Sequence, residues 1–230
     1  MGRYSSNAGL IVACRTLGYL DDSMAILDPT YGKGTFWKEW YPENLVATDH
    51  HPLKSPDLDG GADFRDLPWP AGQFDAIVFD GPYKLNGTPT EEVDERYGVD
   101  VPARWQDRMI LMEEGIDALV PLTRSWFLMK CQDQVVSQAK RWQTREFADR
   151  IEGHGFRLVD MLHIEGYRTQ PPRKCPECKG KGSVAYEAPD DAGHHQAVIC
   201  PRCHGAKKLR IQEHSRGNYS TMLVCRRIPG

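Results

Sequence analysis

Residues 24–34 read MAILDPTYGKG, a short apolar run that ends in Asp28 and continues into a loop with two glycines. The run is long enough for a buried strand, and Gly32 and Gly34 let the backbone turn tightly and approach a ligand closely. A dinucleotide-binding loop would have a third glycine where this chain has Trp37, and the spacing of a P-loop is also missing. The stretch therefore predicts a strand and a loop that suits a nucleoside better than a pyrophosphate, although a glycine turn after a strand is common.

Two further apolar runs also end in an acid, Asp49 in LVATD and Asp80 in DAIVFD. Other strand-like runs alternate with patterns of helical spacing. Helices are expected over residues 35–41, 108–120 and 138–153, and further strands over 125–131, 156–164 and 220–228. This alternation predicts an α/β fold with an open parallel sheet and helices on both of its faces.

The three strand-end acids indicate where a ligand would bind. A single acid at the end of a strand is most simply a capping residue, so none of Asp28, Asp49 and Asp80 is informative alone. Ligands of open parallel sheets bind at the carboxyl ends of the strands. Three such acids in series, the first followed by G-x-G, therefore predict a nucleoside-type site at that edge.

The sequence FDGPY, residues 79–83, has two interpretations. Asp-Gly is a common turn dipeptide, and taken alone the stretch is a turn. It also follows a predicted buried strand, in the same relation to that strand as DPTYGKG has to its own. An acid, a proline and an aromatic residue at this edge of the sheet favour a reaction centre.

Together these motifs resemble the S-adenosylmethionine-dependent amino-methyltransferases of DNA, with phage and bacterial members. The resemblance rests on D-P-x-x-G-x-G after a strand, an acid closing the next strand, D-x-P-Y closing the fourth, and the final segment NYSTMLVCRR. It implies a class I methyltransferase fold with a Rossmann-like sheet. The core would comprise residues 1–168 and 212–230, and residues 169–211 would form a zinc-ribbon insertion between the last two strands.

The resemblance implies a set of residues around S-adenosylmethionine. Asp49 would hold the ribose hydroxyls, as a strand-end acid can, and Asp63 and Phe64 would meet the adenine through its amine and its ring face. The residues that would surround the methionine part are Asp28, Pro29, Thr30, Gly32 and Gly34. Many members carry an aromatic residue where this chain has threonine.

The resemblance also implies that FDGPY is the catalytic loop. A base amine is a poor nucleophile because its lone pair is delocalised into the ring, so transfer needs hydrogen-bond acceptors and a stacking surface for a flipped base. Asp80 and the carbonyl of Gly81 would accept the amine hydrogens, Pro82 would stiffen the loop, and Tyr83 would stack on the base. The usual motif is D-P-P-Y, so Gly81 would loosen the loop. An acid in first place favours adenine N6 over cytosine N4.

Four of the seven cysteines form two C-x2-C pairs, Cys175 with Cys178 and Cys200 with Cys203. Each pair places two thiolates on one tight turn, as a tetrahedral zinc site requires. Zinc is favoured over disulfides because the chain lacks a secretory signal, although disulfides or free thiols stay open. Four thiolates leave no open coordination position, so the zinc would be structural.

The net charge is −3, yet basic residues gather between positions 168 and 227. This asymmetry favours an anionic partner there, and double-stranded DNA is expected to contact the insertion; a solvated knob that merely closes the hairpin is the alternative. The expected phosphate contacts are Lys174, Lys179, Lys181, Arg202, Lys207, Lys208 and Arg210. No apolar run is long enough to span a bilayer, so the expected location is the cytoplasm of a bacterium, or of a host cell if a phage encodes the protein.

Three functions stay open from the sequence. The leading one is methylation of adenine N6 in DNA, and the second is methylation of cytosine N4 or of an RNA amine. The third is a nucleic-acid-binding zinc module on a core that no longer turns over, which Gly81 and Thr30 keep open. The polar segment from Lys84 to Arg104 follows the catalytic loop and is either a flap over the substrate or a plain surface loop.

Overall fold

The computed structural model describes residues 3–85, 102–167, 173–189, 195–209 and 217–229 of the chain. It divides into two compact units. The core unit comprises Met1–Glu165 and Tyr219–Gly230, and the insertion unit comprises Gly166–Asn218. Each unit is described by itself below. Among the described residues, no helix is long and apolar enough to cross a membrane.

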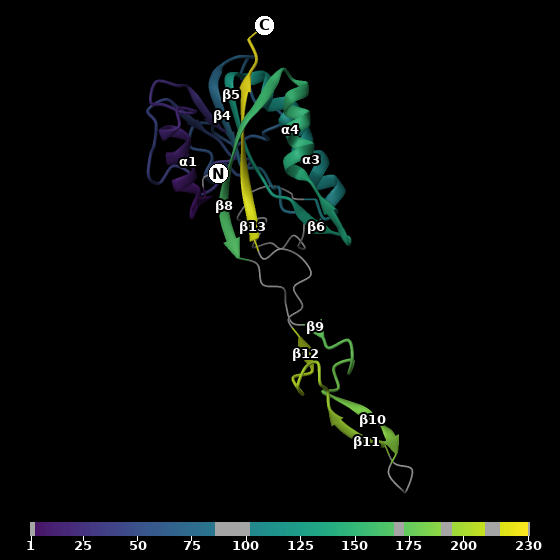
Figure 1. Ribbon diagram of the computed structural model, residues 1–230. Helices are drawn as coiled ribbons and strands as arrows, with labels where there is room; N and C mark the ends of the chain where they lie inside the picture. Colours follow the sequence, from purple (N-terminus) through teal and green to yellow (C-terminus); the bar gives the residue numbers. More distant parts are fainter. Residues whose placement is uncertain (1–2, 86–101, 168–172, 190–194, 210–216, 230) are drawn as a thin grey trace. The chain divides into compact units, whose positions relative to one another are not determined.

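The core unit is built on one seven-stranded sheet (Figure 1). Strand β2 pairs in parallel with β3 on one side and with β4 on the other, and β4 pairs in parallel with β5. The last strand, β13, joins β5 antiparallel, and the short β1 pairs in parallel with β8 at the edge. The order across the sheet is β3 (Leu45–Ala47), β2 (Ile26–Asp28), β4 (Phe74–Phe79), β5 (Thr123–Cys131), β13 (Gly217–Arg227), β8 (Phe156–Tyr167) and β1 (Arg3–Tyr4).

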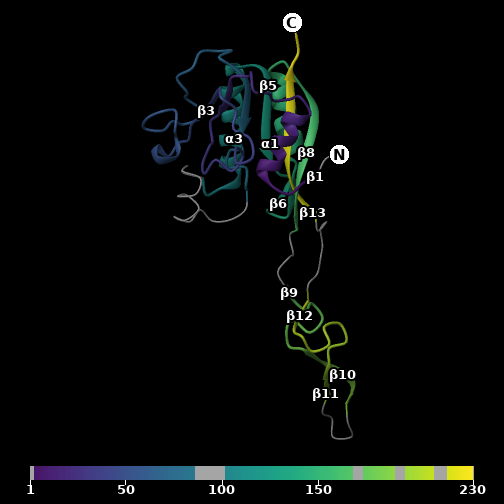
Figure 2. The same cartoon turned by 90° about the vertical axis from the view of Figure 1, so that its left-hand side faces the viewer.

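Helices cover both faces of this sheet (Figure 2). Successive residues of a strand point to opposite faces, so Ile77 packs against α3 (Trp105–Leu119) and α4 (Gln143–Gly153). Its neighbours Ala76 and Val78 pack against α1 (Asn7–Thr16). The strands carry apolar residues at consecutive positions because both faces are buried.

Two expected helices differ from the structure. Residues 35–41 form bends and no helix, because Phe36, Trp37 and Trp40 all pack into the apolar cluster under α1. The indole N–H groups of Trp37 and Trp40 also bond carboxylates outside the segment, which holds it in an irregular path. The helix expected over 138–153 begins only at Gln143.

The residues before α4 form a hairpin instead. Strand β6 (Gln134–Val136) pairs antiparallel with β7 (Ala139–Arg141). The two turn residues, Ser137 and Gln138, have left-handed φ angles of 50° and 63°, as a two-residue hairpin turn requires. Two short 3-10 helices, Pro52–Lys54 and Val120–Leu122, complete the core unit's described elements.

The insertion unit consists of two small antiparallel ribbons. Strand β9 (Arg173–Lys174) pairs with β12 (Lys208–Leu209), and β10 (Ser183–Pro189) pairs with β11 (His195–Ile199). Its apolar centre is the four cysteines, against which Val184 and Leu209 pack. So small a core cannot support a fold without a further cross-link such as a metal ion.

Candidate active site and zinc-ribbon cluster

The three strand-end acids meet at one edge of the sheet. Strand β2 ends at Asp28, Asp80 follows β4 directly, and Asp49 lies just beyond β3. Because β2, β3 and β4 are parallel, their carboxyl ends share that edge. The structure therefore brings the acids of the two main sequence motifs together.

Thr30 connects the glycine loop to the FDGPY loop. The backbone N–H of Asp80 donates to Thr30 Oγ1 at 2.9 Å. The Thr30 backbone N–H donates to Asp28 Oδ1 at 2.9 Å, and its hydroxyl lies 3.4 Å from the same oxygen. A small hydroxyl side chain can make this bridge whereas an aromatic ring cannot, which gives the threonine at this position a structural reason.

Asp28 is a buried carboxyl held by an indole. Trp37 Nε1 donates to Asp28 Oδ2 at 2.7 Å. Burial raises the pKa of Asp28 to about 7, although the hydrogen bonds from Trp37 and Thr30 oppose that shift. Trp37 stands where a dinucleotide-binding loop would have its third glycine. Its side chain instead holds the carboxylate of Asp28 at the end of β2. Pro29 is buried beside it.

Asp49 fixes the glycine loop from the neighbouring strand. Its Oδ2 accepts the Gly32 N–H at 2.9 Å, and its Oδ1 accepts the His51 N–H at 2.8 Å. Burial raises the pKa of Asp49. Gly32 and Gly34 have left-handed φ angles of 58° and 62°, which favour glycine. The ribose contact expected of Asp49 stays a prediction.

The two residues expected at the adenine are engaged by the protein itself. Arg65 forms an ion pair with Asp63, 2.6 Å from Nη2 to Oδ2, and lowers the pKa of that carboxyl. The ring of Phe64 is 3% exposed and lies 5.0 Å from the ring of Phe79, centroid to centroid. This packing favours a core role for Phe64, and the adenine contact of both residues stays a prediction.

A lysine that the sequence motifs did not include reaches Asp80. The register of β4 and β5 places Phe79 beside Met129, so the next residue of each strand, Asp80 and Lys130, are neighbours. Lys130 Nζ lies 3.2 Å from Asp80 Oδ2, and the two side chains are 8% and 20% exposed. Burial raises the pKa of Asp80, while the Lys130 ammonium lowers it. Burial lowers the pKa of Lys130, but the Asp80 carboxylate and Tyr83 together raise it by more, so the net shift is upward and the lysine stays charged.

The second oxygen of Asp80 has no partner. Asp80 Oδ1 is buried and accepts no hydrogen bond from any described residue. Buried polar atoms in folded proteins are almost always hydrogen-bonded, so this oxygen is a place where a ligand donor or a water molecule would complete the site. Lys130 holds Oδ2, and Oδ1 is left for that donor.

Two buried glutamines hold the FDGPY loop, residues 79–83. The side-chain amides of Gln134 and Gln143 both donate to the carbonyl of Tyr83, at 2.9 Å and 2.8 Å. The Tyr83 N–H donates to the Gly81 carbonyl at 2.7 Å around the buried Pro82, which makes a tight turn. A carbonyl oxygen has two lone pairs, so Gly81 can accept a second donor.

The Tyr83 ring is 8% exposed. Its hydroxyl lies 3.2 Å from Ser220 Oγ of β13, and Lys130 Nζ lies 5.4 Å from its ring centroid. The structure therefore places Tyr83 at the edge of the sheet that carries the strand-end acids, with the lysine against its ring, and its stacking on a base stays a prediction.

Gly81 is required by packing. A Cβ at this position would lie 2.6 Å from Phe79 Cζ and 2.8 Å from Met112 Sδ, so neighbouring atoms would have to move. The departure from D-P-P-Y is thus matched by a large ring and a thioether that fill the space a proline would need. This packing gives a reason for the glycine, and the expectation that it loosens the loop stays a prediction.

Local sequence signals differ among the residues that the motifs missed. Lys130 interrupts the apolar run SWFLMKC, and a charged residue in a buried strand is a usable signal for a site. Gln134 and Gln143 carry no such signal, because only the fold brings them to Tyr83. The segment from Lys84 to Arg104 lies mostly outside the described residues, and its proposed flap role with it.

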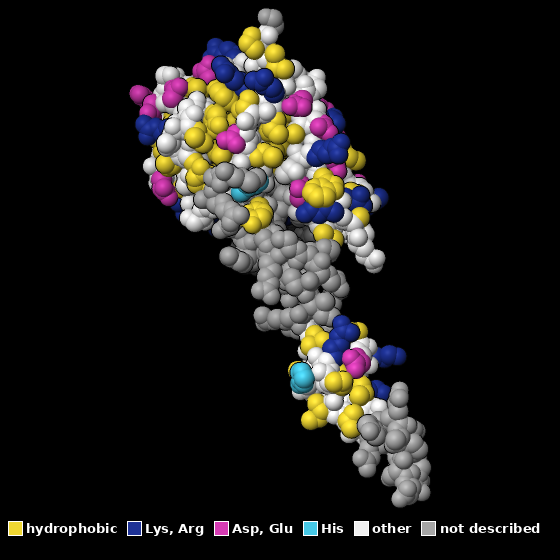
Figure 3. All heavy atoms as spheres, in the orientation of Figure 1, with side chains coloured by type: hydrophobic (Ala, Val, Ile, Leu, Met, Phe, Trp, Pro, Cys, Tyr) yellow, Lys and Arg dark blue, Asp and Glu magenta, His cyan; other side chains and the backbone are white. Residues whose placement is uncertain are grey.

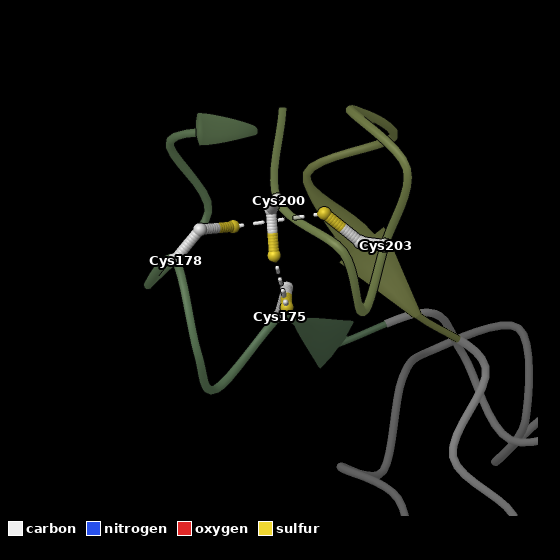
Figure 4. A group of neighbouring side chains, drawn as sticks. All are labelled: Cys175, Cys178, Cys200 and Cys203. Atoms are coloured by element: carbon white, nitrogen blue, oxygen red, sulfur yellow. Dashed lines mark hydrogen bonds between the residues drawn. The ribbon is translucent and has the colours of Figure 1, made fainter. Parts of the chain in front are cut away.

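The four cysteines form one compact cluster (Figure 4). All four Sγ atoms lie within 4.8 Å of one another, with Cys175 3.8 Å from Cys200 and Cys178 3.7 Å from Cys203. A tetrahedral zinc with Zn–S bonds of about 2.3 Å has sulfur–sulfur edges of about 3.8 Å. A disulfide would need about 2.05 Å. The cluster therefore fits a zinc ion and does not fit disulfides.

The two halves of the cluster repeat each other. Lys179 and His204, each directly after the second cysteine of a pair, have left-handed φ angles of 51° and 46°, and a left-handed glycine follows each. The halves also exchange equivalent bonds, because the N–H of Cys175 donates to Lys207 O at 2.9 Å and that of Cys200 to Gly182 O at 3.0 Å. The backbone thus holds the sulfurs in place from both sides.

Backbone donors also act on one thiol. Burial raises the pKa of Cys178, but hydrogen bonds with the N–H groups of Gly182 and Gly180 and with the thiols of Cys203 and Cys175 together lower it to about 6. A thiolate stabilised in this way is the form that binds zinc.

The surface of the insertion unit is strongly basic. Apart from Glu177, its described, exposed charged side chains are all Lys or Arg, several of them visible in dark blue in Figure 3. Arg210 lies outside the described residues. The exposed basic residues are Lys174, Lys179, Lys181, Arg202, Lys207 and Lys208.

No protein-family model matches the sequence, and no curated protein does. Among solved structures, a candidate methyltransferase from Bacillus halodurans C-125 matches with a TM-score of 0.52 and 9% identity, over 94% of this chain and 97% of that one. The core has the class I methyltransferase fold.

Two other structures are more distant. The MccD protein matches with a TM-score of 0.49 and 13% identity, over 98% of this chain and 100% of that one. A magnesium protoporphyrin IX methyltransferase from Synechocystis PCC 6803, with bound SAM, matches with a TM-score of 0.45 and 10% identity, over 96% and 78%. These likenesses are too remote to bear on the substrate.

Proposed function

We propose that this protein transfers a methyl group from S-adenosylmethionine to the exocyclic amine of a flipped base in double-stranded DNA, with adenine N6 as the acceptor. The observation that carries the proposal is the state of Asp80. One oxygen is held by Lys130, the backbone N–H is held by Thr30, and no residue within the described parts of the chain donates to the buried Oδ1. An amine hydrogen is the kind of donor that this oxygen lacks.

The loop would prepare the amine for attack. Asp80 Oδ1 accepts one amine hydrogen and the Gly81 carbonyl accepts the other, which draws the nitrogen away from planarity and frees its lone pair. Bound S-adenosylmethionine would supply the methyl group, which would bond to this lone pair while the electron pair of the S–CH3 bond would stay on sulfur. The nitrogen then releases a proton to Asp80, whose pKa is already raised by burial. Positioning thus supplies most of the catalysis.

The glycine loop would hold the methyl donor. S-adenosylmethionine carries an ammonium group, and Asp28 and the backbone around Gly32 and Gly34 lie at the edge where ligands of such sheets bind. Asp28 is buried and ionises near neutral pH, so a cationic ligand would stabilise its charged form. These contacts rest on the fold and on the sequence resemblance.

The insertion unit would add affinity for DNA. Four thiolates fill the coordination sphere of a zinc ion, so zinc here would stabilise the fold and would take no part in methyl transfer. The exposed lysines and arginines around it would bind phosphates, which adds affinity without reading sequence. Reversing the charge of Lys179, Lys181 and Arg202 together should weaken DNA binding and flatten its salt dependence.

A methyl-transfer assay tests the proposal. The wild-type protein is incubated with labelled S-adenosylmethionine and DNA or RNA, and the methylated nucleoside is identified after digestion. Asp80→Ala should abolish transfer while cofactor binding persists, whereas Asp149→Asn, an exposed site on α4, should change neither. Transfer to cytosine or to RNA would replace the acceptor proposed here, and retained activity in Asp80→Ala would remove the role of the catalytic loop.

A further inference from the structure

The β6–β7 hairpin has two faces with different partners. Paired residues in the hairpin are Gln134 with Arg141 and Val135 with Lys140, and neighbouring residues of a strand point to opposite faces. Gln134 faces inward and bonds the carbonyl of Tyr83. Val135 and Lys140 therefore lie on the opposite face, and Lys140 is exposed.

An exposed tryptophan follows directly on this outer side. Trp142 is 55% exposed, and Lys140 Nζ lies 5.1 Å from its ring centroid. On the inner side, the guanidinium of Arg141 stacks on Trp105 at 4.1 Å. On the outer side, an exposed cation beside an exposed indole combines the two groups with which proteins bind nucleic-acid strands, a positive charge and a stacking ring.

Helix stability does not explain Trp142. It occupies the N-cap position of α4 but makes no side-chain capping bond, although Ser, Thr, Asp or Asn there would stabilise the helix. Asp133 serves the helix start from outside instead, accepting the Thr144 N–H at 2.9 Å. The exposed ring of Trp142 is therefore available to a binding partner.

The hairpin is also tied to the catalytic loop. Gln134 lies in β6 and Gln143 follows Trp142, and both donate to the same carbonyl of Tyr83. The outer face of the hairpin is thus fixed relative to the catalytic loop by hydrogen bonds on both of its flanks. A strand held on this face would keep a constant relation to Asp80.

We propose that Lys140 and Trp142, here called the hairpin surface, bind the DNA strand next to the flipped base. Trp142 stacks on a neighbouring base that has lost its stacking partner, and Lys140 binds the adjacent phosphate. The positive charge and the exposed ring match DNA, whose phosphates are anionic and whose bases have π-faces. This inference rests on the proposed function and adds the surface that positions the strand.

The test measures the affinity of the full-length protein for a fluorescent mixed-sequence DNA duplex by anisotropy at several salt concentrations. Trp142→Ala should weaken binding about 5- to 150-fold with the salt slope unchanged, and Trp142→Phe should restore most of it. Lys140→Gln should reduce the slope of log K against log salt by about 0.9. The matched controls are Leu17→Ala, which is 50% exposed, and Arg157→Gln, exposed at the start of β8.

Each outcome separates this inference from the proposed function. Wild-type affinity and wild-type methyl transfer in both Trp142→Ala and Lys140→Gln would overturn the hairpin surface and leave the methyltransferase intact. Loss of binding in both, with cofactor affinity and melting temperature retained, supports the surface even if no methyl transfer to DNA is found. Equal losses in the Leu17→Ala and Arg157→Gln controls, or tighter binding of an RNA duplex than of DNA, would also overturn it.

Discussion

Replacing Gly81 with alanine should destabilise the protein, although the same change at an unconstrained glycine would stabilise it. The added Cβ would lie 2.6 Å from Phe79 Cζ and 2.8 Å from Met112 Sδ. Phe79 is fully buried and packs on Phe64, so its ring has little freedom to retreat. Met112 is also fully buried, although its thioether is more adaptable.

Two opposing effects decide whether Gly81→Ala raises or lowers the free energy of unfolding. Removing a glycine lowers the entropy of the unfolded chain and stabilises the folded state by about 0.4–1 kcal/mol. Overpacking a close-packed core costs about 1–3 kcal/mol. The packing term is larger, so Gly81→Ala should lower the free energy of unfolding by roughly 1–2 kcal/mol.

Chemical denaturation measures this effect. Gly153→Ala is the matched control, because a Cβ there meets nothing within 4 Å and the residue ends helix α4; it should be neutral or stabilising. In a Met112→Ala background, the cost of Gly81→Ala should shrink because the thioether is gone. A stabilising effect of Gly81→Ala, or an equal cost in both backgrounds, would refute the packing explanation.

Three further predictions concern the charges and the metal. Lys130→Met should move the acid limb of the pH–rate profile to higher pH, because the buried Asp80 carboxylate loses the ammonium that lowers its pKa. Lys130→Arg keeps a positive charge and should leave the profile unchanged. If the acid limb does not move in Lys130→Met, Lys130 only fills space. The affinity for S-adenosylmethionine, measured by calorimetry, should fall about tenfold from pH 8 to pH 6 because Asp28 protonates with a pKa of about 7; an equal pH dependence in Asp28→Asn would assign the titration elsewhere. The purified protein should contain zinc. A chelator should unfold the insertion unit, which would be measured as rapid hydrogen exchange in β10 and β11 while the core unit stays protected. Unchanged protection of β10 and β11 after the zinc is lost would mean that the ribbon folds without metal.

The sheet could be predicted from the sequence because its strands are apolar on both faces. The runs around Ile26, Val46 and Ile77 each end near an acid, and that repetition identified the edge where a site would lie. The metal-binding pattern of the four cysteines could also be predicted, since their spacing alone brings two thiolates onto each turn. Both features depend on local sequence, which is why they were accessible.

Other features depend on contacts between distant segments. The aromatic residues of 35–41 have helical spacing, but their rings are buried under α1 and Trp37 bonds Asp28, so tertiary packing overrides the local pattern. The β6–β7 hairpin turns through Ser137 and Gln138 without a glycine, and its turn therefore carries no sequence signal. The partnership of Lys130 with Asp80 depends on the register of two strands that lie far apart in the chain.

The most direct measurement is the mass of the nucleosides in duplex DNA after incubation with the protein and S-adenosylmethionine whose methyl group is deuterated. The label distinguishes this protein's product from methylation already present in the DNA. We expect N6-(trideuteromethyl)adenine in the DNA treated with the wild-type protein and no such product in the DNA treated with Asp80→Ala. Unlabelled adenine in both samples, with the cofactor bound by both proteins, would contradict it.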